Sequence, residues 1–366
     1  MNSKMDIAVE VIGLTKNYGP VTAVKSVSFR IESGQYFALL GPSGGGKTTL
    51  LRLIGGFAKP TSGRVLLHGQ EVNGLAPNER PTSMVFQSYA LFPHMTVERN
   101  VAFGLRLRKL PKDEILETVD GMLELVGLTG YNERMPHELS GGQQQRVQLA
   151  RSLVLESDIL LLDEPLASLD AKLRKDMCLE LKRIQEKVGI TFIHVTHNQE
   201  EAITIADRIA IIADGEMVEE GTARDIYEHP IKRFTADFIG ENNVIDGRVV
   251  VKSEDQVTVD FGFAKIDVHA AGAQVQEGDK VSVSIRSELL ELMEPGHNVN
   301  GQMQTIPATY VEEVYLGLTT SHLVSLPNGA ELTMRRISEV QSDTRFKSGQ
   351  AVKIGWRTAH ARLHTA

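Results

Sequence analysis

Cysteine, aromatic residues and long apolar runs are all scarce in this sequence, and each shortage excludes a class of protein. The single cysteine, Cys178, excludes an internal disulfide framework and a multi-thiolate metal site, and it fits a reducing compartment. Aromatic residues make up only 5% of the chain, which favours an α/β enzyme over an aromatic-rich binding module. The longest aliphatic runs, such as residues 159–162, are far shorter than the ~20 residues that span a bilayer.

The polar first ten residues and the net negative charge of the chain exclude further classes of protein. Met1 to Glu10 are mixed and polar, without the apolar segment or cleavage site of a secretory signal. The 366 residues carry a formal charge of −8, which argues against a general nucleic-acid binder because such proteins need a net basic face. We therefore expect a soluble, cytoplasmic protein of two or three domains, whose role at a membrane would come through a partner.

The first two-thirds of the chain alternates short aliphatic runs with helical patterns. The aliphatic runs are residues 36–40, 159–162, 190–195 and 209–213. Continuous runs of this length are typical of strands that are buried on both faces of a parallel sheet. Residues 173–188 instead repeat apolar side chains at helical spacing, with charged residues on the other face. The alternation predicts an α/β domain over residues 1–240.

The alternation of aliphatic runs and helical patterns ends at residues 233–240, where we expect the junction between two domains. Val257, Val259 and Phe261 alternate with other residues at the period of a strand, and so do Val281, Val283 and Ile285. Pro327-Asn328-Gly329 separates two further runs as a hairpin turn would. We predict a small all-β, OB-like domain over residues 241–366.

A phosphate-binding motif follows the first aliphatic run. Residues 41–48 read Gly-Pro-Ser-Gly-Gly-Gly-Lys-Thr and match G-x-x-x-x-G-K-[ST], with an apolar helix expected from Lys47 to about Ile54. Backbone N–H groups of such a loop form a nest for phosphate oxygens, and the helix N-terminus adds partial positive charge. Lys47 is expected to contact the β- and γ-phosphates, and the Thr48 hydroxyl to ligate Mg²⁺.

Two adjacent acids follow the aliphatic run 159–162. Ligand chemistry in a parallel sheet lies at the carboxyl ends of the strands, which is where Asp163 and Glu164 stand. Such a pair is by itself often a solvated turn or a helix cap, but the phosphate-binding motif upstream favours catalysis. Asp163 is expected to hold Mg²⁺ through water, and Glu164 to accept a proton from the attacking water.

Leu139-Ser140-Gly141-Gly142-Gln143, together with the phosphate-binding motif, resembles the signature of the ATP-binding cassette (ABC) family. The other motifs of that family follow in its order over residues 7 to about 240. They are Tyr18 as the adenine-stacking aromatic, Gln87 in Phe86-Gln87-Ser88-Tyr89 as the Q-loop glutamine, Asp170 in Ser168-Leu169-Asp170 as the D-loop, and His197 in Val195-Thr196-His197 as the switch histidine.

The resemblance implies ATP and Mg²⁺ as cofactors, together with a full set of site residues. The implied nucleotide-binding residues are Tyr18, Gly41, Ser43, Gly44, Gly45, Gly46, Lys47, Thr48, Thr49, Ser140, Gly141, Gly142, Gln143 and Asp170. The implied metal site is Thr48, Gln87 and Asp163, and the implied catalytic residues are Glu164, His197 and Gln87. Ser140, Gly141 and Gly142 are expected to start a helix that runs to about Leu155. The signature would serve the γ-phosphate of ATP that is bound by a second copy of the chain, so that ATP holds a dimer together.

The C-terminal region resembles the TOBE-type accessory domain of ABC importers at residues 281–288 and 310–317. This likeness implies permease subunits as partners, with residues 87–97 gripping a permease loop, and indirectly a periplasmic or extracellular solute-binding protein. It also implies a peripheral location on the cytoplasmic face of the inner membrane. Residues 78–81, 86–97 and 139–147 look most like the polyamine, opine and phosphonate branch, near the spermidine/putrescine importers. Importers of ferric iron, of sugar or of the phosphonate type stay open as alternatives.

Other classes of protein fit the sequence less well. Soluble ABC ATPases of translation or DNA repair usually have two cassettes or a long coiled-coil insertion, and P-loop GTPases carry an Asn-Lys-x-Asp motif; the sequence has none of these. A nucleic-acid role for the C-terminal domain is disfavoured by its single Trp and acidic surroundings. The chain departs from many ABC proteins at Gly45, where they carry Cys, and at Asn198, where Asp is usual. We expect little change in the chemistry from either departure.

Overall fold

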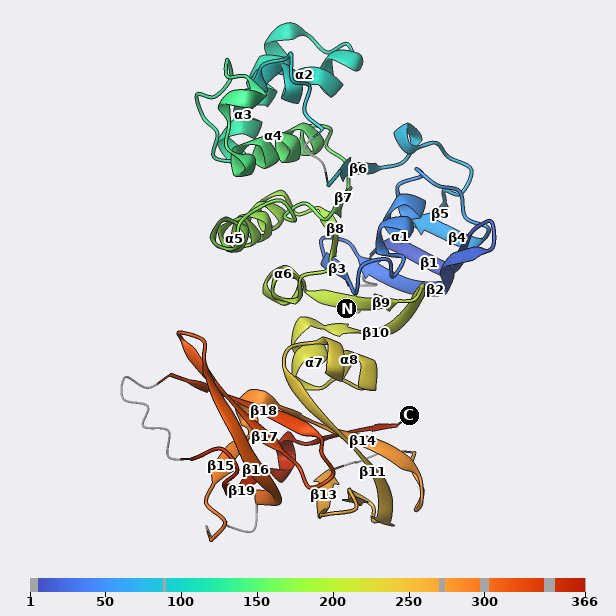
Figure 1. Cartoon of the computed structure of the whole chain (residues 1–366). Coiled ribbons are helices and arrows are strands. Elements are labelled where there is room, and N and C mark those ends of the chain that lie inside the picture. Colours follow the sequence, from blue (N-terminus) through green and yellow to red (C-terminus); the bar gives the residue numbers. More distant parts are fainter. Residues whose placement is uncertain (1–5, 88–89, 270–273, 297–302, 339–345, 366) are drawn as a thin grey trace, which may run out of the picture. The chain divides into compact units, whose positions relative to one another are not determined.

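A computed structural model describes residues 6–87, 90–269, 274–296, 303–338 and 346–365, which form two compact units (Figure 1). Unit 1 extends to Arg224, and unit 2 begins at Asp225. Each unit has its own hydrophobic core.

The described part of unit 1 contains a six-stranded sheet in the order β10-β9-β3-β8-β7-β6. Its strands are β3 (Tyr36–Leu40), β6 (Thr82–Val85), β7 (Ile159–Asp163), β8 (Thr191–Thr196), β9 (Arg208–Ala213) and β10 (Glu216–Thr222). All pairs are parallel except β9 with β10. Every residue of β3, β7 and β8 is buried, which is why these segments appear in the sequence as unbroken apolar runs.

A second sheet of unit 1 is antiparallel and was not predicted from the sequence. Its order is β2-β1-β4-β5, with β1 (Ile7–Tyr18), β2 (Val21–Glu32), β4 (Ser62–Leu67) and β5 (Gln70–Glu71). Apolar side chains of β1, β2 and β4 form one core with those of α1 (Lys47–Ile54) and of the parallel strands. In Figure 1, α1 and this sheet lie on one side of the parallel strands, and α5 (Ala171–Val188) and α6 (Gln199–Ile205) lie on the other.

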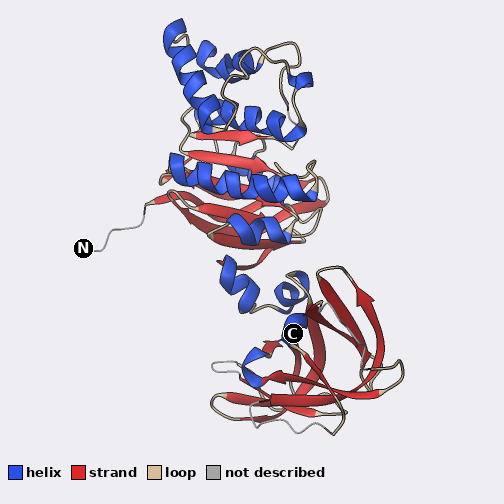
Figure 2. Ribbon diagram, turned by 90° about the vertical axis from the view of Figure 1, so that its left-hand side faces the viewer, coloured by secondary structure: helices blue, strands red, loops and turns tan. Residues whose placement is uncertain are grey.

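The chain between β6 and β7 forms a separate group of helices. They are α2 (Val97–Leu107), α3 (Lys112–Leu125) and α4 (Gly141–Leu153), with a short 3₁₀ turn at Pro136–Glu138. Another 3₁₀ turn, at Pro77–Glu79, precedes β6. The α4 helix packs against α2, α3 and β6, and Figure 2 shows this group at the end of the unit. The predicted helix after the signature therefore exists, and it ends at Leu153 rather than near Leu155.

Unit 2 is built almost entirely of short antiparallel strands. Among the described residues, one sheet has the order β13-β12-β11-β14-β20 and the other β15-β19-β16-β17-β18. The strands are β11 (Asn242–Lys252), β12 (Gln256–Asp260), β13 (Lys265–His269), β14 (Lys280–Arg286), β15 (Glu291–Met293), β16 (Met303–Tyr315), β17 (Thr319–Ser325), β18 (Glu331–Ile337), β19 (Ala351–Arg357) and β20 (Arg362–Thr365), with 3₁₀ turns at Ser287–Leu289 and Thr358–His360. The predicted hairpin at 327–329 joins β17 to β18.

Two short helices precede these strands: α7 (Ala223–Glu228) and α8 (Arg233–Phe238). The α8 helix packs against β11 and β14, so the segment expected to be the junction contributes to the second unit. Apolar side chains from both sheets, including the fully buried Trp356, form the core of unit 2. The predicted architecture, an α/β domain followed by a small all-β domain, is confirmed.

Candidate active site

The phosphate-binding motif forms the turn between β3 and α1, where the sequence placed it. A Cβ atom on Gly41 would lie 1.9 Å from the Ile212 carbonyl oxygen, so only glycine fits against β9 at this position. Gly46 precedes the first turn of α1 with φ 100°, a left-handed conformation that glycine adopts without strain. Glycine at these two positions lets the loop lead closely into the first turn of α1, and the N–H groups of such a loop and helix start can bind an anion.

The Lys47 ammonium group lies inside this loop. Its Nζ donates hydrogen bonds of 2.8 Å to the carbonyl oxygens of Gly41 and Pro42, and the residue is 4% exposed. Burial lowers the pKa of Lys47, and the nearby Glu164 and Asp163 carboxylates oppose part of that shift. A charge that is desolvated and held by the backbone before any ligand arrives is well prepared to contact a phosphate.

Thr48 and Asp163 form a pair of oxygen ligands beside the loop. The Thr48 hydroxyl donates a 2.8 Å hydrogen bond to Asp163 Oδ1, joining the first turn of α1 to the end of β7. Burial raises the pKa of Asp163, while the Thr48 hydrogen bond and the charge of Arg52 oppose that rise. In the described part of the chain, no group of three or more His, Cys, Asp or Glu residues could hold a metal by itself. The pair fits Mg²⁺, which commonly takes one or two protein oxygens and completes its shell with phosphates and water.

The Glu164 carboxylate is the point where three predicted catalytic residues meet. Its Oε2 accepts a 3.2 Å hydrogen bond from Gln87 Nε2 and lies 3.3 Å from His197 Nδ1. The Glu164 side chain is 18% exposed and that of His197 is 51% exposed, so the cluster is open to a ligand on one side. Gln87 binds here through its amide nitrogen, which leaves its carbonyl oxygen for a metal ion.

Strained backbone holds Glu164 in this position. Its φ of 46° is a left-handed conformation that costs a non-glycine residue of order 1–3 kcal/mol. The Glu164 N–H donates a 3.0 Å hydrogen bond to the Val195 carbonyl oxygen, which ties the turn after β7 to the end of β8. Strain of this kind persists where the surroundings fix it, and it directs the carboxylate toward Gln87 and His197.

The signature lies on a different element from the phosphate loop. Ser140 caps α4: its Oγ accepts from the Gln143 N–H at 3.4 Å, and the Ser140 N–H donates to Gln143 Oε1 at 2.9 Å. This capping box fixes the helix start, so Gly141 and Gly142 begin α4 as the sequence predicted. Asp170 likewise caps α5, with Oδ1 accepting from the Leu173 N–H at 3.0 Å.

Tyr18 stands apart from the carboxylate cluster at the end of β1. Its side chain is 51% exposed, and the Lys16 ammonium lies 4.8 Å from the ring centroid. An exposed ring can offer a face to an adenine base. The structure thus groups Lys47, Thr48, Gln87, Asp163, Glu164 and His197, whereas Tyr18, residues 140–143 and Asp170 have separate local contacts.

The sequence did not reveal how the Gln87 segment is held. Gln148 Nε2 donates to the Phe86 carbonyl oxygen at 3.0 Å, and Arg151 Nη1 donates to the Ala90 carbonyl oxygen at 2.8 Å. Both donors lie on α4, so the signature helix holds the backbone on either side of Gln87. Ser88 and Tyr89 of the predicted Q-loop lie outside the described residues. The only feature of the sequence that indicates these contacts is the run of polar residues on the buried side of α4.

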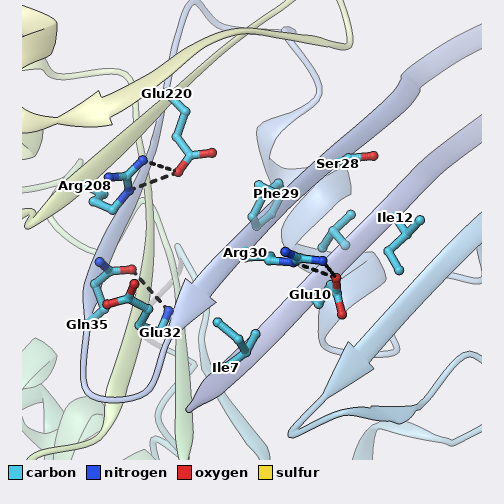
Figure 3. Close-up of a pocket in the computed structure, with 11 residues that line it drawn as sticks. Ile7, Glu10, Ile12, Ser28, Phe29, Arg30, Glu32, Gln35, Arg208 and Glu220 are labelled. Carbon is cyan, nitrogen blue, oxygen red and sulfur yellow. Dashed lines mark hydrogen bonds and ion pairs between the residues drawn. The ribbon is translucent and has the colours of Figure 1, made fainter. Parts of the chain in front are cut away.

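A hollow on unit 1 is lined by other residues. It has a volume of about 640 Å³, and its walls carry the ion pairs Arg30–Glu10 and Arg208–Glu220 (Figure 3). None of its lining residues belongs to the phosphate loop, the signature or the carboxylate cluster. The four residues of these two ion pairs neutralise one another in charge, and none of the predicted catalytic residues faces this hollow.

Asn198, at the position where ABC proteins usually carry Asp, fills the structural role that Asp would have. Asn198 caps α6, with its Oδ1 accepting from the Glu201 N–H at 3.1 Å. Asn and Asp are about equally good at this position of a helix. The substitution therefore removes a formal charge beside His197 without removing the cap.

Alkylation of the only cysteine is expected to leave nucleotide binding intact. Cys178 is buried in α5, and burial raises the pKa of its thiol to about 12. At neutral pH the group is therefore the unreactive thiol rather than the thiolate. The measurement is ATP affinity before and after treatment with N-ethylmaleimide, with labelling under denaturing conditions as the control. Inhibition that ATP prevents would contradict the expectation.

None of the helices in the described part of the chain has the length and apolar content needed to cross a bilayer.

Comparison with protein families gives two matches along the chain. The ABC transporter family model matches residues 24–167, and the TOBE domain model matches residues 283–363.

Curated relatives match over nearly the full length. The spermidine/putrescine import ATP-binding protein PotA of Rubrobacter xylanophilus is 45% identical over 359 residues, which cover 98% of this chain and 93% of that protein. The protein of the same name from Roseobacter denitrificans is 45% identical over 366 residues, covering 99% of each chain.

Solved structures resemble a part of the chain. CbiO1 from Clostridium perfringens, part of the ABC transporter complex cbiONQ, is 32% identical and covers 60% of this chain and 90% of its own, with a TM-score of 0.57. The dimeric cassette MJ0796 bound to ADP and Pi is 33% identical and covers 59% of this chain and 99% of its own, with a TM-score of 0.53.

Proposed function

The chain belongs to the ABC transporter family of ATP-binding import proteins, which hydrolyse ATP to drive transport, and from this premise we propose that it energises the uptake of polyamines. The observation that carries the hydrolytic part is the Glu164 carboxylate, which touches Gln87 and His197 beside the Thr48–Asp163 pair. The full-length identity of 45% to spermidine/putrescine import proteins carries the choice of solute.

The proposed chemistry divides among the residues of the site. Lys47 and the N–H groups of the phosphate loop bind the β- and γ-phosphates, and the Tyr18 ring stacks on the adenine. Glu164 accepts a proton from the attacking water as general base, and Gln87 and His197 hold that water and the γ-phosphate in line. Removal of a proton and alignment of the water together lower the barrier to hydrolysis.

Mg²⁺ belongs to this proposal as the ion that neutralises charge on the β- and γ-phosphates. Thr48 and Asp163 would hold it, with Gln87 contributing its amide oxygen. An adjacent cation would also favour the ionised form of Asp163, against the burial that raises the pKa of this carboxyl group.

A second copy of the chain completes the site in this proposal. The start of α4, at residues 140–143, has N–H groups and a helix dipole suited to a phosphate, yet it lies on the helical group rather than beside the phosphate loop. Paired head to tail, two chains would each supply the signature to the ATP of the other. The ADP- and Pi-bound relative is itself dimeric, which supports this arrangement.

The remaining partners follow from the importer assignment. The proposed partners are permease subunits, which residues 87–97 would grip, and indirectly a periplasmic or extracellular solute-binding protein. The chain would then lie peripherally on the cytoplasmic face of the inner membrane. We assign nucleotide binding and hydrolysis to residues 1–240 and an accessory role to residues 241–366.

Transport by the reconstituted importer tests the choice of solute. With the permease subunits that co-purify with this chain in proteoliposomes, radiolabelled spermidine or putrescine is expected to accumulate only when ATP is supplied. The matched control is the same importer with Glu164→Gln, which should bind ATP but not accumulate the solute. Uptake of ferric iron or a sugar, without uptake of polyamines, would overturn the polyamine assignment and leave the ATPase assignment standing.

A further inference from the structure

Glu201 is a buried carboxylate that the proposed chemistry does not use. It lies in α6, four residues beyond His197, and is 5% exposed. Its Oε2 accepts a 2.6 Å hydrogen bond from the Thr196 hydroxyl, and its Oε1 lies 3.5 Å from Arg174 Nε. A buried charge is tolerated only when it is paired and hydrogen-bonded, so the surroundings of Glu201 must supply both.

Glu201 fixes the residues on both sides of His197. Thr196, just before the histidine, donates to the Glu201 carboxylate, and its hydroxyl oxygen also accepts from the Asn198 N–H at 2.9 Å. Asn198, just after the histidine, accepts the Glu201 N–H through its side chain at 3.1 Å. The backbone of His197 is thus enclosed in a ring of hydrogen bonds that closes on Glu201, while its imidazole is free to reach Glu164.

A second branch leads from Glu201 to the D-loop. Arg174, which faces the Glu201 carboxylate, donates through Nη2 to the Leu169 carbonyl oxygen at 2.8 Å. Leu169 directly precedes Asp170, the cap of α5. One carboxylate therefore joins the strand end that carries the switch histidine to the turn that carries the D-loop aspartate.

The buried His194 ring lies next to the Glu201 carboxylate, and the buried Tyr36 ring lies next to His194. His194 Nε2 lies 3.6 Å from Glu201 Oε2, and His194 Nδ1 hydrogen-bonds the Tyr36 hydroxyl at 2.9 Å. Burial alone would raise the pKa of Glu201, but His194, Thr196 and Arg174 together hold it below its ordinary value. The carboxylate is therefore ionised at neutral pH, and a displacement of Glu201 would separate it from the Arg174 guanidinium group.

We propose that Glu201 is a positioning residue for ATP hydrolysis, which sets His197 and the D-loop in one fixed arrangement through Thr196 and Arg174. The inference rests on the proposed role of His197. A glutamine at this position could still accept from Thr196, but it carries no charge to hold Arg174. The arrangement should then loosen while every contact of the phosphate loop stays in place.

Steady-state ATPase measurements on the full-length chain test this inference. Glu201→Gln is expected to lower kcat by about tenfold to a hundredfold with an unchanged KM for ATP, because a small displacement of His197 affects hydrolysis and not binding. The matched control is Glu200→Gln, a neighbouring exposed glutamate on α6, which should change neither constant. An unchanged kcat in Glu201→Gln would overturn the inference.

The His197→Ala background separates positioning from a general effect on folding. If Glu201 acts through His197, adding Glu201→Gln to His197→Ala should cause little further loss, because coupled residues are not additive. A further loss of the same tenfold to a hundredfold would show that Glu201 acts elsewhere and would overturn the inference. Full activity of His197→Ala alone would instead refute the proposed function.

A second pair of variants keeps the test decisive should Glu201→Gln not fold. Thr196→Val removes the hydroxyl at nearly constant size and is expected to reduce kcat, whereas Thr196→Ser keeps the hydroxyl and should restore it. Equal activity of the two variants would mean that the hydrogen bond to Glu201 does not position His197, which overturns the inference.

Discussion

Replacing Glu164 with Gln is expected to slow ATP hydrolysis by about 10²–10⁴ while leaving ATP binding intact. Glutamine has the same shape and can still accept a hydrogen bond from Gln87, but it cannot take a proton from water. It also lacks the charge that faces His197 at 3.3 Å. The nucleotide itself is held by the phosphate loop, which the substitution does not touch.

The measurements are phosphate release, ATP affinity and the oligomeric state in the presence of ATP. Because hydrolysis stops and binding continues, Glu164→Gln should accumulate as an ATP-bound dimer. Glu156→Gln is a matched control, since Glu156 is exposed and also has a positive φ, 53° against 46° for Glu164. Retained turnover in Glu164→Gln would exclude the assignment of this residue as general base.

The sequence predicted the phosphate loop well because the whole motif is local. A buried run, a glycine-rich turn and a helix start lie within residues 36–54, and the structure forms them as β3, the loop and α1. The same holds for the start of α4, where Ser140 and Gln143 form a capping box over one turn of helix. Local geometry of this kind is determined by residues that are close together in the sequence.

The antiparallel sheet of unit 1 could not be predicted in the same way. Its strands β1 and β2 carry mixed apolar and polar residues and several register irregularities, so the alternation of period two is broken. The β1 strand also pairs with β4, across the intervening β3 and α1. Pairing between segments so far apart depends on the tertiary core and leaves little local signal.

The convergence of the catalytic residues was predicted only through the family resemblance. Gln87 and Glu164 are 77 residues apart, and nothing in either local sequence indicates that their side chains touch. Glu201 illustrates what the motifs leave out. It lies within a helical pattern beside another glutamate, and only the packing of α6 against α5 shows that Glu201 is buried against Arg174 while Glu200 is exposed.

Replacing Lys47 with Ala is expected to weaken ATP binding itself, in contrast to Glu164→Gln. Truncating one partner of a buried, hydrogen-bonded charge pair costs about 2–5 kcal/mol, or about 30-fold to 5,000-fold in affinity. Lys47 meets that description once phosphate is bound, because its ammonium group is enclosed by the carbonyl oxygens of Gly41 and Pro42.

The loss in Lys47→Ala should affect binding rather than folding. Burial lowers the pKa of Lys47, which means that the charged ammonium group is less favourable in the ligand-free loop than in water. Without nucleotide, the variant should therefore unfold at nearly the same temperature as the parent chain, and only the stabilisation by added ATP should disappear. Calorimetric titration with ATP measures the affinity, and Lys25→Ala, which removes an exposed ion pair with Glu216, is the control. Unchanged ATP affinity in Lys47→Ala would mean that the loop binds phosphate through its backbone alone, and Lys47 would lose its assigned role.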